Sequence, residues 1–180
     1  SAERRGELHP LLEKAVSVLI DKCADPHYRV VHEALGGICA LAAAFPHALE
    51  PHLERCLPAV LSKAHEAKDA TRAVAHTALQ AVQQAYAPDA LVPVLLRVLD
   101  VNQPRVRAAA LGMLGSTAHG AAHYLQHQAH MRQCVSKCHT HLSDKAPELR
   151  RAALSALHSL HEAGGASFLS QVAGLPVPAQ

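Results

Sequence analysis

The sequence predicts an all-α protein in which helical hairpins stack side by side as an α-solenoid. A short signature recurs along the chain, in which an aliphatic residue or Thr and then a basic residue open a small-residue helix. Its copies are Thr71-Arg72, Val106-Arg107 and Leu149-Arg150, with a degenerate first copy at Val30-Val31. Starting from Val30, the copies follow at intervals of 41, 35 and 43 residues. Self-similarity at this period indicates stacked helix pairs, a class of scaffold that presents long edges and faces to other proteins.

Helical periodicity and composition favour the same class. Apolar residues recur at intervals of three and four, as at Leu149, Ala153, Ala156 and Leu160, which is typical of an amphipathic helix. No sustained apolar/polar alternation between hairpin turns occurs, so no sheet is expected. Hydrophobic residues make up 49% of the chain and aromatic residues only 3%. The core must therefore consist of Leu, Val, Ile and Ala, which suits closely packed helices.

Turn residues place the helices in order. The pairs are predicted over residues 8–23 with 29–44, 48–63 with 71–85, 91–99 with 105–117, and 130–142 with 148–163. Asp25-Pro26 separates the first two helices, because Asp can cap the following helix and Pro fits its first turn. Pro46 and Pro51 mark the entry to the second pair.

The remaining punctuation sets the domain organisation. Pro88-Asp89 opens the third pair, and Gly164-Gly165 ends the last helix of the fourth. We expect one solenoid over residues 8–175, between disordered ends at residues 1–7 and 176–180. Its repeats are predicted at residues 8–45, 48–86, 89–118 and 123–163, with a partial closing helix at 167–175.

Charged residues are distributed unequally between the two edges that a stack of hairpins would have. The turns within pairs carry one basic residue per repeat: Arg29, Lys68, Arg105 and Lys145. The connections between pairs, at residues 46–50, 84–89, 115–124 and 162–170, contain no Lys or Arg. A one-sided basic row indicates an acidic partner surface. The alternative interpretation is ordinary solvation of polar turns, which also contain helix-capping acidic residues.

A row of helix pairs with basic residues in successive turns resembles a TOG domain, the HEAT-repeat module that binds tubulin. The chain is most similar to the carboxy-terminal TOG-like domain of the CLASP family, through residues 19–43, 48–75, 91–99 and 135–160 and the trailing 168–175. The resemblance implies that the within-pair turns face tubulin or microtubules, in the cytoplasm and cytoskeleton. The contact residues it implies are His27, Tyr28, Arg29, Lys68, Arg105 and Lys145. It also implies an alternative, the docking of an adaptor protein instead of tubulin.

Chemistry at a metal or catalytic centre is not favoured. Fifteen histidines invite a metal interpretation, and Cys134, Cys138 and His141 lie at helical spacing. Three ligands fall short of the four that a structural zinc site needs, so we expect no metal and no cofactor. No phosphate-binding loop, nucleophile elbow or H-E-x-x-H motif occurs, so we expect no catalytic residue and no enzyme. Arg150 and Arg151 could contact a partner, but the basic position of the signature more often ties a helix start to a neighbouring Asp.

Net charge and hydropathy exclude two further classes of partner. The formal net charge of +2 is small and aromatic residues are sparse, so nucleic acid is not expected. No apolar run approaches the length of a membrane span, so no membrane insertion is expected. An odd number of cysteines in predicted helices indicates free buried thiols, typical of a reducing, intracellular compartment. We expect a monomeric, non-enzymatic protein-binding domain.

Overall fold

Eleven α-helices and two short 3-10 helices form the fold, with no β-strand in the part of the chain that the structure describes. The structure is a computed structural model and describes residues 2–173 and 175. The helical hairpins predicted from the sequence are thereby confirmed. The chain divides into two compact units, Ser1–Tyr86 and Ala87–Gln180, and each is described by itself.

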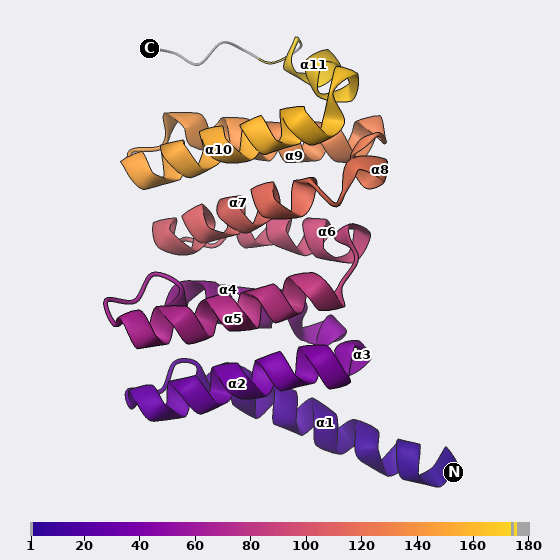
Figure 1. Ribbon diagram of the computed structural model, residues 1–180, viewed down its shortest axis with the longest axis vertical. Helices are drawn as coiled ribbons and strands as arrows, with labels where there is room; N and C mark the ends of the chain where they lie inside the picture. Colours follow the sequence, from indigo (N-terminus) through magenta and orange to yellow (C-terminus); the bar gives the residue numbers. More distant parts are fainter. Residues whose placement is uncertain (1, 174, 176–180) are drawn as a thin grey trace. The chain divides into compact units, whose positions relative to one another are not determined.

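Unit 1 contains two helix pairs. Its elements are α1 (Ala2–Lys22), α2 (Tyr28–Ala44), α3 (Pro46–Leu49), the 3-10 helix η1 (Glu50–His52), α4 (Leu53–Lys63) and α5 (Asp69–Ala85). The second helices of the two pairs, α2 and α5, pack along each other, and α4 pairs with α5 (Figure 1). Leu35 and Ile38 of α2 and Leu57 and Leu61 of α4 are completely buried. The buried apolar positions thus follow the helical period that the sequence shows.

Unit 2 repeats this arrangement. Its elements are α6 (Pro88–Val98), α7 (Pro104–Ala118), α8 (Ala122–Leu125), α9 (Gln128–Thr140), the 3-10 helix η2 (His141–Ser143), α10 (Pro147–Gly164) and α11 (Ala166–Val172). Here α7 and α10 pack along each other, with α6 and α9 on the other side (Figure 1). Gly115 lies at this contact, where a Cβ would come within 3.3 Å of the Ser159 hydroxyl oxygen on α10. Gly165 turns the chain from α10 into α11 at a φ of 48°, which is accessible to glycine at little steric cost.

The structure differs from the sequence-based expectations at several places along the chain. The single helix expected over residues 48–63 is divided into α3, η1 and α4, because Pro51 cannot donate a backbone N–H to a continuous helix; Pro46 is the first residue of α3. Helix α1 begins at Ala2, so residues 2–7, expected to be disordered, are helical. The expected tail at residues 176–180 lies outside the described residues. In the first signature copy, the buried residue is Val31 and Val30 is half-buried, so the register shifts by one residue.

Candidate protein-binding edges

The first within-pair turn of unit 1 is ordered by Asp25. One carboxylate oxygen accepts a hydrogen bond from the backbone N–H of His27 at 2.9 Å, and the other pairs with Lys22 at 3.0 Å. The backbone hydrogen bond from His27, followed by Lys22, lowers the pKa of Asp25. An acceptor held two residues before its donor closes an Asx-turn. The turn places His27 directly before α2, so that Tyr28 and Arg29 project from the first turn of that helix.

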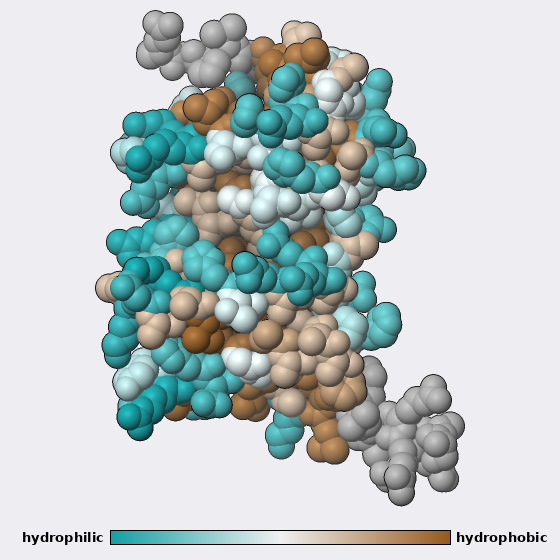
Figure 2. Space-filling model, viewed as in Figure 1, coloured by the Kyte–Doolittle hydropathy of each residue, from teal (hydrophilic) through white to brown (hydrophobic). Residues whose placement is uncertain are grey.

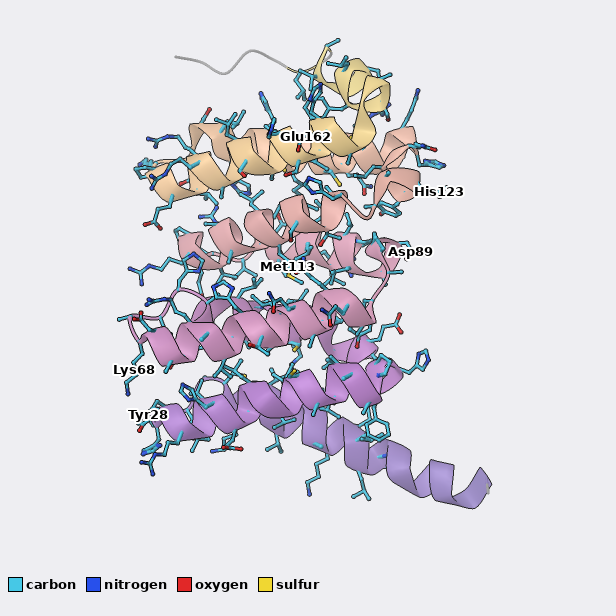
Figure 3. The ribbon with its side chains drawn as sticks, in the orientation of Figure 1. Tyr28, Lys68, Asp89, Met113, His123 and Glu162 are labelled. Carbon is cyan, nitrogen blue, oxygen red and sulfur yellow. The ribbon has the colours of Figure 1, made fainter. Side chains whose placement is uncertain are left out.

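Tyr28 is the centre of a cluster of side chains on this edge. The ammonium nitrogen of Lys68, which directly precedes α5, lies 3.5 Å from the Tyr28 ring centroid. Figure 3 shows Tyr28 and Lys68 at the same ends of α2 and α5. Arg29 donates from Nε to the Tyr28 hydroxyl at 3.3 Å, and His27 stacks on the ring at 5.4 Å between centroids. The two turns of unit 1 therefore present one connected aromatic and basic surface.

His32 joins the two helices behind this surface. Its Nε2 lies 2.9 Å from Thr71 Oγ1 in a part-buried hydrogen bond, and its ring meets Tyr28 edge-on. Thr71 is a buried polar residue, 5% exposed. A buried hydroxyl needs a partner, because an unpaired one costs about 1–3 kcal/mol. The His32–Thr71 bond thus holds the starts of α2 and α5 together, on which the positions of Tyr28 and Lys68 depend.

Unit 2 repeats the Asx-turn at its second within-pair turn. An Asp144 carboxylate oxygen accepts from the backbone N–H of Ala146 at 2.9 Å, the same two-residue separation as between Asp25 and His27. His27 and Ala146 each occupy the N-cap position of the helix that follows, without a side-chain capping hydrogen bond. Lys145 lies between donor and acceptor, and its side chain is exposed. The corresponding residue of the first turn is Pro26, so the shared construction does not in itself place a basic side chain at the tip.

The signature arginines act inside the repeat. In the second and fourth repeats the arginine returns to its own turn: Arg72 donates to the carbonyls of Glu66 and Ala67 at 2.7 and 2.9 Å. Arg150 donates to Asp144 and Lys145 at 2.8 and 3.0 Å, with the same separations along the chain. Each arginine satisfies carbonyl groups that the turn leaves without helical partners.

Arg107, the signature arginine of the third repeat, reaches the next repeat instead. Its Nη1 lies 3.7 Å from an Asp144 carboxylate oxygen, in a largely buried pair. The expectation that this basic position ties a helix start to a neighbouring Asp is borne out for Arg107 and for Arg72, which also pairs with Asp69. Arg151 is exposed and lies beside Leu154 in a shallow concavity.

Arg105 and Lys68 each line a concavity that also contains acidic side chains, which are Asp25 and Glu66 in the case of Lys68. Arg105 is the second residue of α7 and lines its concavity with Gln103 and Glu148. An acidic side chain therefore shares its surface, which weakens its attraction for an acidic partner. Figure 2 shows hydrophilic side chains over the turn ends of the helices in each unit.

The structure brings together four of the six predicted contact residues: His27, Tyr28, Arg29 and Lys68. Arg105 and Lys145 are exposed within unit 2, and an alignment of all the basic turns along one edge remains a prediction. Sequence reasoning missed the supporting residues His32 and Thr71. The available signal was the repeated signature itself. Thr71 stands at its first position, and His32 stands at its basic position once the first copy is shifted to begin at Val31.

The remaining chemistry-bearing residues lie apart from these edges. Cys134 and Cys138 are completely buried, and burial raises the pKa of Cys134 to about 12. His130 stacks on Tyr124 with ring centroids 4.0 Å apart. Within the described ranges, no group of three or more His, Cys, Asp or Glu side chains could hold a metal ion. None of the helices in these ranges is both long enough and apolar enough to span a bilayer.

The helix pairs and their capped turns define a HEAT-repeat scaffold, and comparison with known proteins gives the family. The chain belongs to the HEAT-repeat family described as stalled ribosome sensor GCN1-like, whose model matches residues 15–173. It is also 31% identical over 100 residues to a CLIP-associated protein of Arabidopsis thaliana. That match covers 55% of this chain and 7% of the relative, so the chain spans a small part of the relative's length.

Solved structures share the fold. A chain from a study of microtubule plus end tracking by XMAP215, CLIP-170 and EB1 superimposes with a TM-score of 0.73 at 18% identity, covering 98% of this chain and 80% of that one. A chain from a study of TOG–tubulin binding specificity gives 0.63 at 17% identity, covering 92% and 63%. The resemblance to HEAT-repeat TOG domains is thereby confirmed, and at these identities it establishes the shared fold.

Proposed function

We propose that this chain is a non-enzymatic protein-binding module of a microtubule-associated protein, acting in the cytoplasm on the cytoskeleton. It contacts tubulin through its within-pair turns, with His27, Tyr28, Arg29 and Lys68 as the main surface and Arg105 and Lys145 as further contacts. The observation that carries the proposal is the Lys68–Tyr28–Arg29 cluster, where the ring centroid of an exposed Tyr28 lies 3.5 Å from the Lys68 ammonium nitrogen and 5.9 Å from the Arg29 guanidinium carbon. The tubulin-binding TOG chain of the same fold supports it.

Charge alone would give weak binding. Exposed ion pairs contribute roughly 0.2–1 kcal/mol each, so four basic turns would supply about 1–4 kcal/mol, and only the upper end of that range reaches a dissociation constant of about a millimolar. Tyr28 changes this estimate, because the residue is 40% exposed and its ring contacts His27, Arg29 and Lys68. A pre-organised aromatic residue at the centre of an interface contributes more than a peripheral charge. Linkage to other tubulin-binding domains would raise the affinity further.

The proposal is tested by pelleting the chain with taxol-stabilised microtubules. Reversing Arg29, Lys68 and Arg105 to Glu should remove most of the pelleted chain and leave the helical circular dichroism unchanged. The matched control, R97E/R132E/R151E, makes the same change of net charge on other surfaces and should pellet like the unmodified chain. Equal pelleting by the unmodified chain and the triple turn variant would contradict the proposal.

The second candidate function is docking of an adaptor protein without tubulin. It is favoured by a groove in unit 2 that is lined by residues of α6 and α9, including Leu96 and Arg132, but by neither Arg105 nor Lys145. A partner that is retained by the triple turn variant and lost from the control variant would indicate this function.

A further inference from the structure

The exposed large hydrophobic side chains of the described residues are unevenly distributed along the chain. Apart from Tyr28, they belong to the first helix pair of unit 1 and to the last two helices of unit 2. They are Leu11, Val18 and Phe45 in unit 1 and Leu154, Leu169 and Val172 in unit 2. The fully described helices α3 to α9 carry none. Because a repeat array needs polar outer faces on its terminal repeats to remain in solution, these apolar side chains indicate two faces on which a further repeat stacks.

The outer face of α10 is the first of these surfaces. Leu154 is 63% exposed and lines a shallow concavity with Arg150 and Arg151. A different side of α10 packs on α7, where Ser159 lies next to Gly115. Helix α11 lies over the carboxyl-terminal end of α10 and leaves the rest of its outer face open (Figure 1). This face therefore combines an uncovered leucine with two arginines.

The repeated signature identifies the outer face of α10 as a stacking face. His32 and Arg107 hold the basic position of the signature, and both contact the following repeat. His32 Nε2 lies 2.9 Å from Thr71 Oγ1, and Arg107 Nη1 lies 3.7 Å from a carboxylate oxygen of Asp144. Arg150 holds the same position on α10. Both of its hydrogen bonds come from Nη1, so its Nη2 donors remain for an acceptor on a repeat stacked outside α10.

The outer side of α1 and α2 is the second surface. Leu11 and Val18 are 65% and 48% exposed. They stand seven residues apart on α1, which places them on the same face of that helix. Glu33 is exposed on α2, directly after His32, whose ring faces α5. This side therefore combines uncovered aliphatic side chains with a carboxylate, which complements the leucine and arginines of α10.

Asp25 occupies in unit 1 the position that Asp144 occupies in unit 2. Each stands three residues before the helix that follows, and each accepts a hydrogen bond from the backbone N–H two residues further on. Asp144 is the acceptor that Arg107 of the preceding repeat reaches. By the same geometry, the signature arginine of a repeat stacked outside α2 would reach Asp25. Lys22 already pairs with Asp25 at 3.0 Å, and its half-exposed side chain can share the carboxylate or give it up.

We propose that the chain stacks head to tail on a second copy of itself, with the outer face of α10 of one copy on the outer side of α1 and α2 of the next. The contact buries Leu154 of one copy and Val18 of the other, and it pairs Arg150 with Asp25. It repeats between two copies the packing of α7 on α10 within unit 2. Pairing of two α10 faces is disfavoured, because it would bring four arginines into one interface. The single copy expected from the sequence is the main species below the dissociation constant of the stack.

Analytical ultracentrifugation of the whole 180-residue chain tests this stacking. Between about 10 μM and about 1 mM, a range that covers weak dissociation constants, the average mass of the unmodified chain should rise beyond that of a dimer. The reason is that a head-to-tail contact leaves a free face at each end of the growing stack. Val18→Glu and Leu154→Glu each remove one face, so each variant alone should stay monomeric. An equimolar mixture of the two variants should form a dimer, through the one intact face that each retains.

The controls separate the stacking contact from changes in charge or folding. Gln80→Glu makes the same change of net charge at an exposed position of α5 and should associate like the unmodified chain. Leu11→Glu, on the same face of α1 as Val18, should behave like Val18→Glu, and all variants should keep the helical circular dichroism. A constant monomer mass of the unmodified chain up to about 1 mM, self-association of either single variant, or a mixture that stays monomeric would overturn the proposal. Loss of association in Gln80→Glu would overturn it as well.

Discussion

Individual side chains on the turns divide into those that project and those that hold the turn. Arg150 and Arg151 are adjacent in sequence, yet Arg150 bonds two carbonyls of the preceding turn and Arg151 projects to solvent. The backbone carbonyl of Lys145 is one of these acceptors, whereas the side chain of Lys145 projects to solvent. A basic residue beside a turn is therefore not in itself a contact residue, because the geometry assigns neighbouring arginines opposite roles.

This division predicts unequal effects on stability. Arg150→Ala should lower the free energy of unfolding by about 1 kcal/mol, because two charge-assisted hydrogen bonds at an exposed site are lost. Arg151→Ala should change it by less than about 0.5 kcal/mol, as for most surface substitutions. Urea denaturation measures both. Equal destabilisation by the two variants would show that the carbonyl contacts of Arg150 are not stabilising.

His141 makes the stability of unit 2 depend on pH. Burial and the nearby charge of Arg107 lower the pKa of His141 below the usual histidine value of about 6.5. The unfolded chain therefore binds a proton at a higher pH than the folded chain does. The free energy of unfolding should fall as the pH drops below about 6.5 and level off below the lowered folded pKa.

The His141→Gln variant tests this contribution. Between about pH 7.5 and pH 5 it should lose less stability than the unmodified chain, since its side chain does not titrate in that range. The control is His65→Gln, a change at an exposed histidine of unit 1, which should keep the original slope. Thermal unfolding across the pH range provides the comparison. Identical slopes for the unmodified chain and His141→Gln would count against the buried imidazole.

At the scale of helices, close approach of α1 and α2 depends on which glycine faces the contact. A Cβ added at Gly37 would lie 2.7 Å from the Leu19 Cδ2 atom, whereas nothing lies within 4 Å of one at Gly36. Two adjacent glycines in one helix therefore have different structural roles. Gly37 permits the packing of α1, and Gly36 occupies an open position.

Alanine substitutions measure this difference. Gly36→Ala should raise the free energy of unfolding by roughly 0.5–1 kcal/mol, because Ala has the higher helix propensity. Gly37→Ala should lose that gain or become destabilising, because Leu19 must move aside, and overpacking typically costs about 1–3 kcal/mol. Chemical denaturation of both variants gives the result. A gain of the same size at Gly37 would show that Leu19 adapts freely.

The helices and turns could be predicted from sequence because their signals are local. Asp25, Pro26 and the repeated aliphatic/basic step marked the starts of helices to within a few residues. The cluster around Tyr28 could be only partly predicted, since Lys68 lies far along the chain and meets the ring only after α2 packs on α5. The groove had no local signal, because Arg97 and Arg132 stand on helices whose proximity comes from tertiary packing. The division of the second pair's first helix was not predicted either, although Pro51 was available as a sign.

At the scale of the molecule, the chain is a HEAT-repeat scaffold with two surfaces of different construction. The turn surface of unit 1 combines an aromatic ring with cations and has a fixed geometry. The groove of unit 2 combines an aliphatic floor with arginines.

Size-exclusion chromatography with soluble αβ-tubulin tests the central claim, that the within-pair turns bind tubulin, most directly. The unmodified chain should elute earlier with tubulin than alone, and R29E/K68E/R105E should elute at its own position, unshifted. The control R97E/R132E/R151E should co-elute with tubulin as the unmodified chain does. Absence of a shift for the unmodified chain at tens of micromolar, or an undiminished shift for the triple turn variant, would contradict the proposed function.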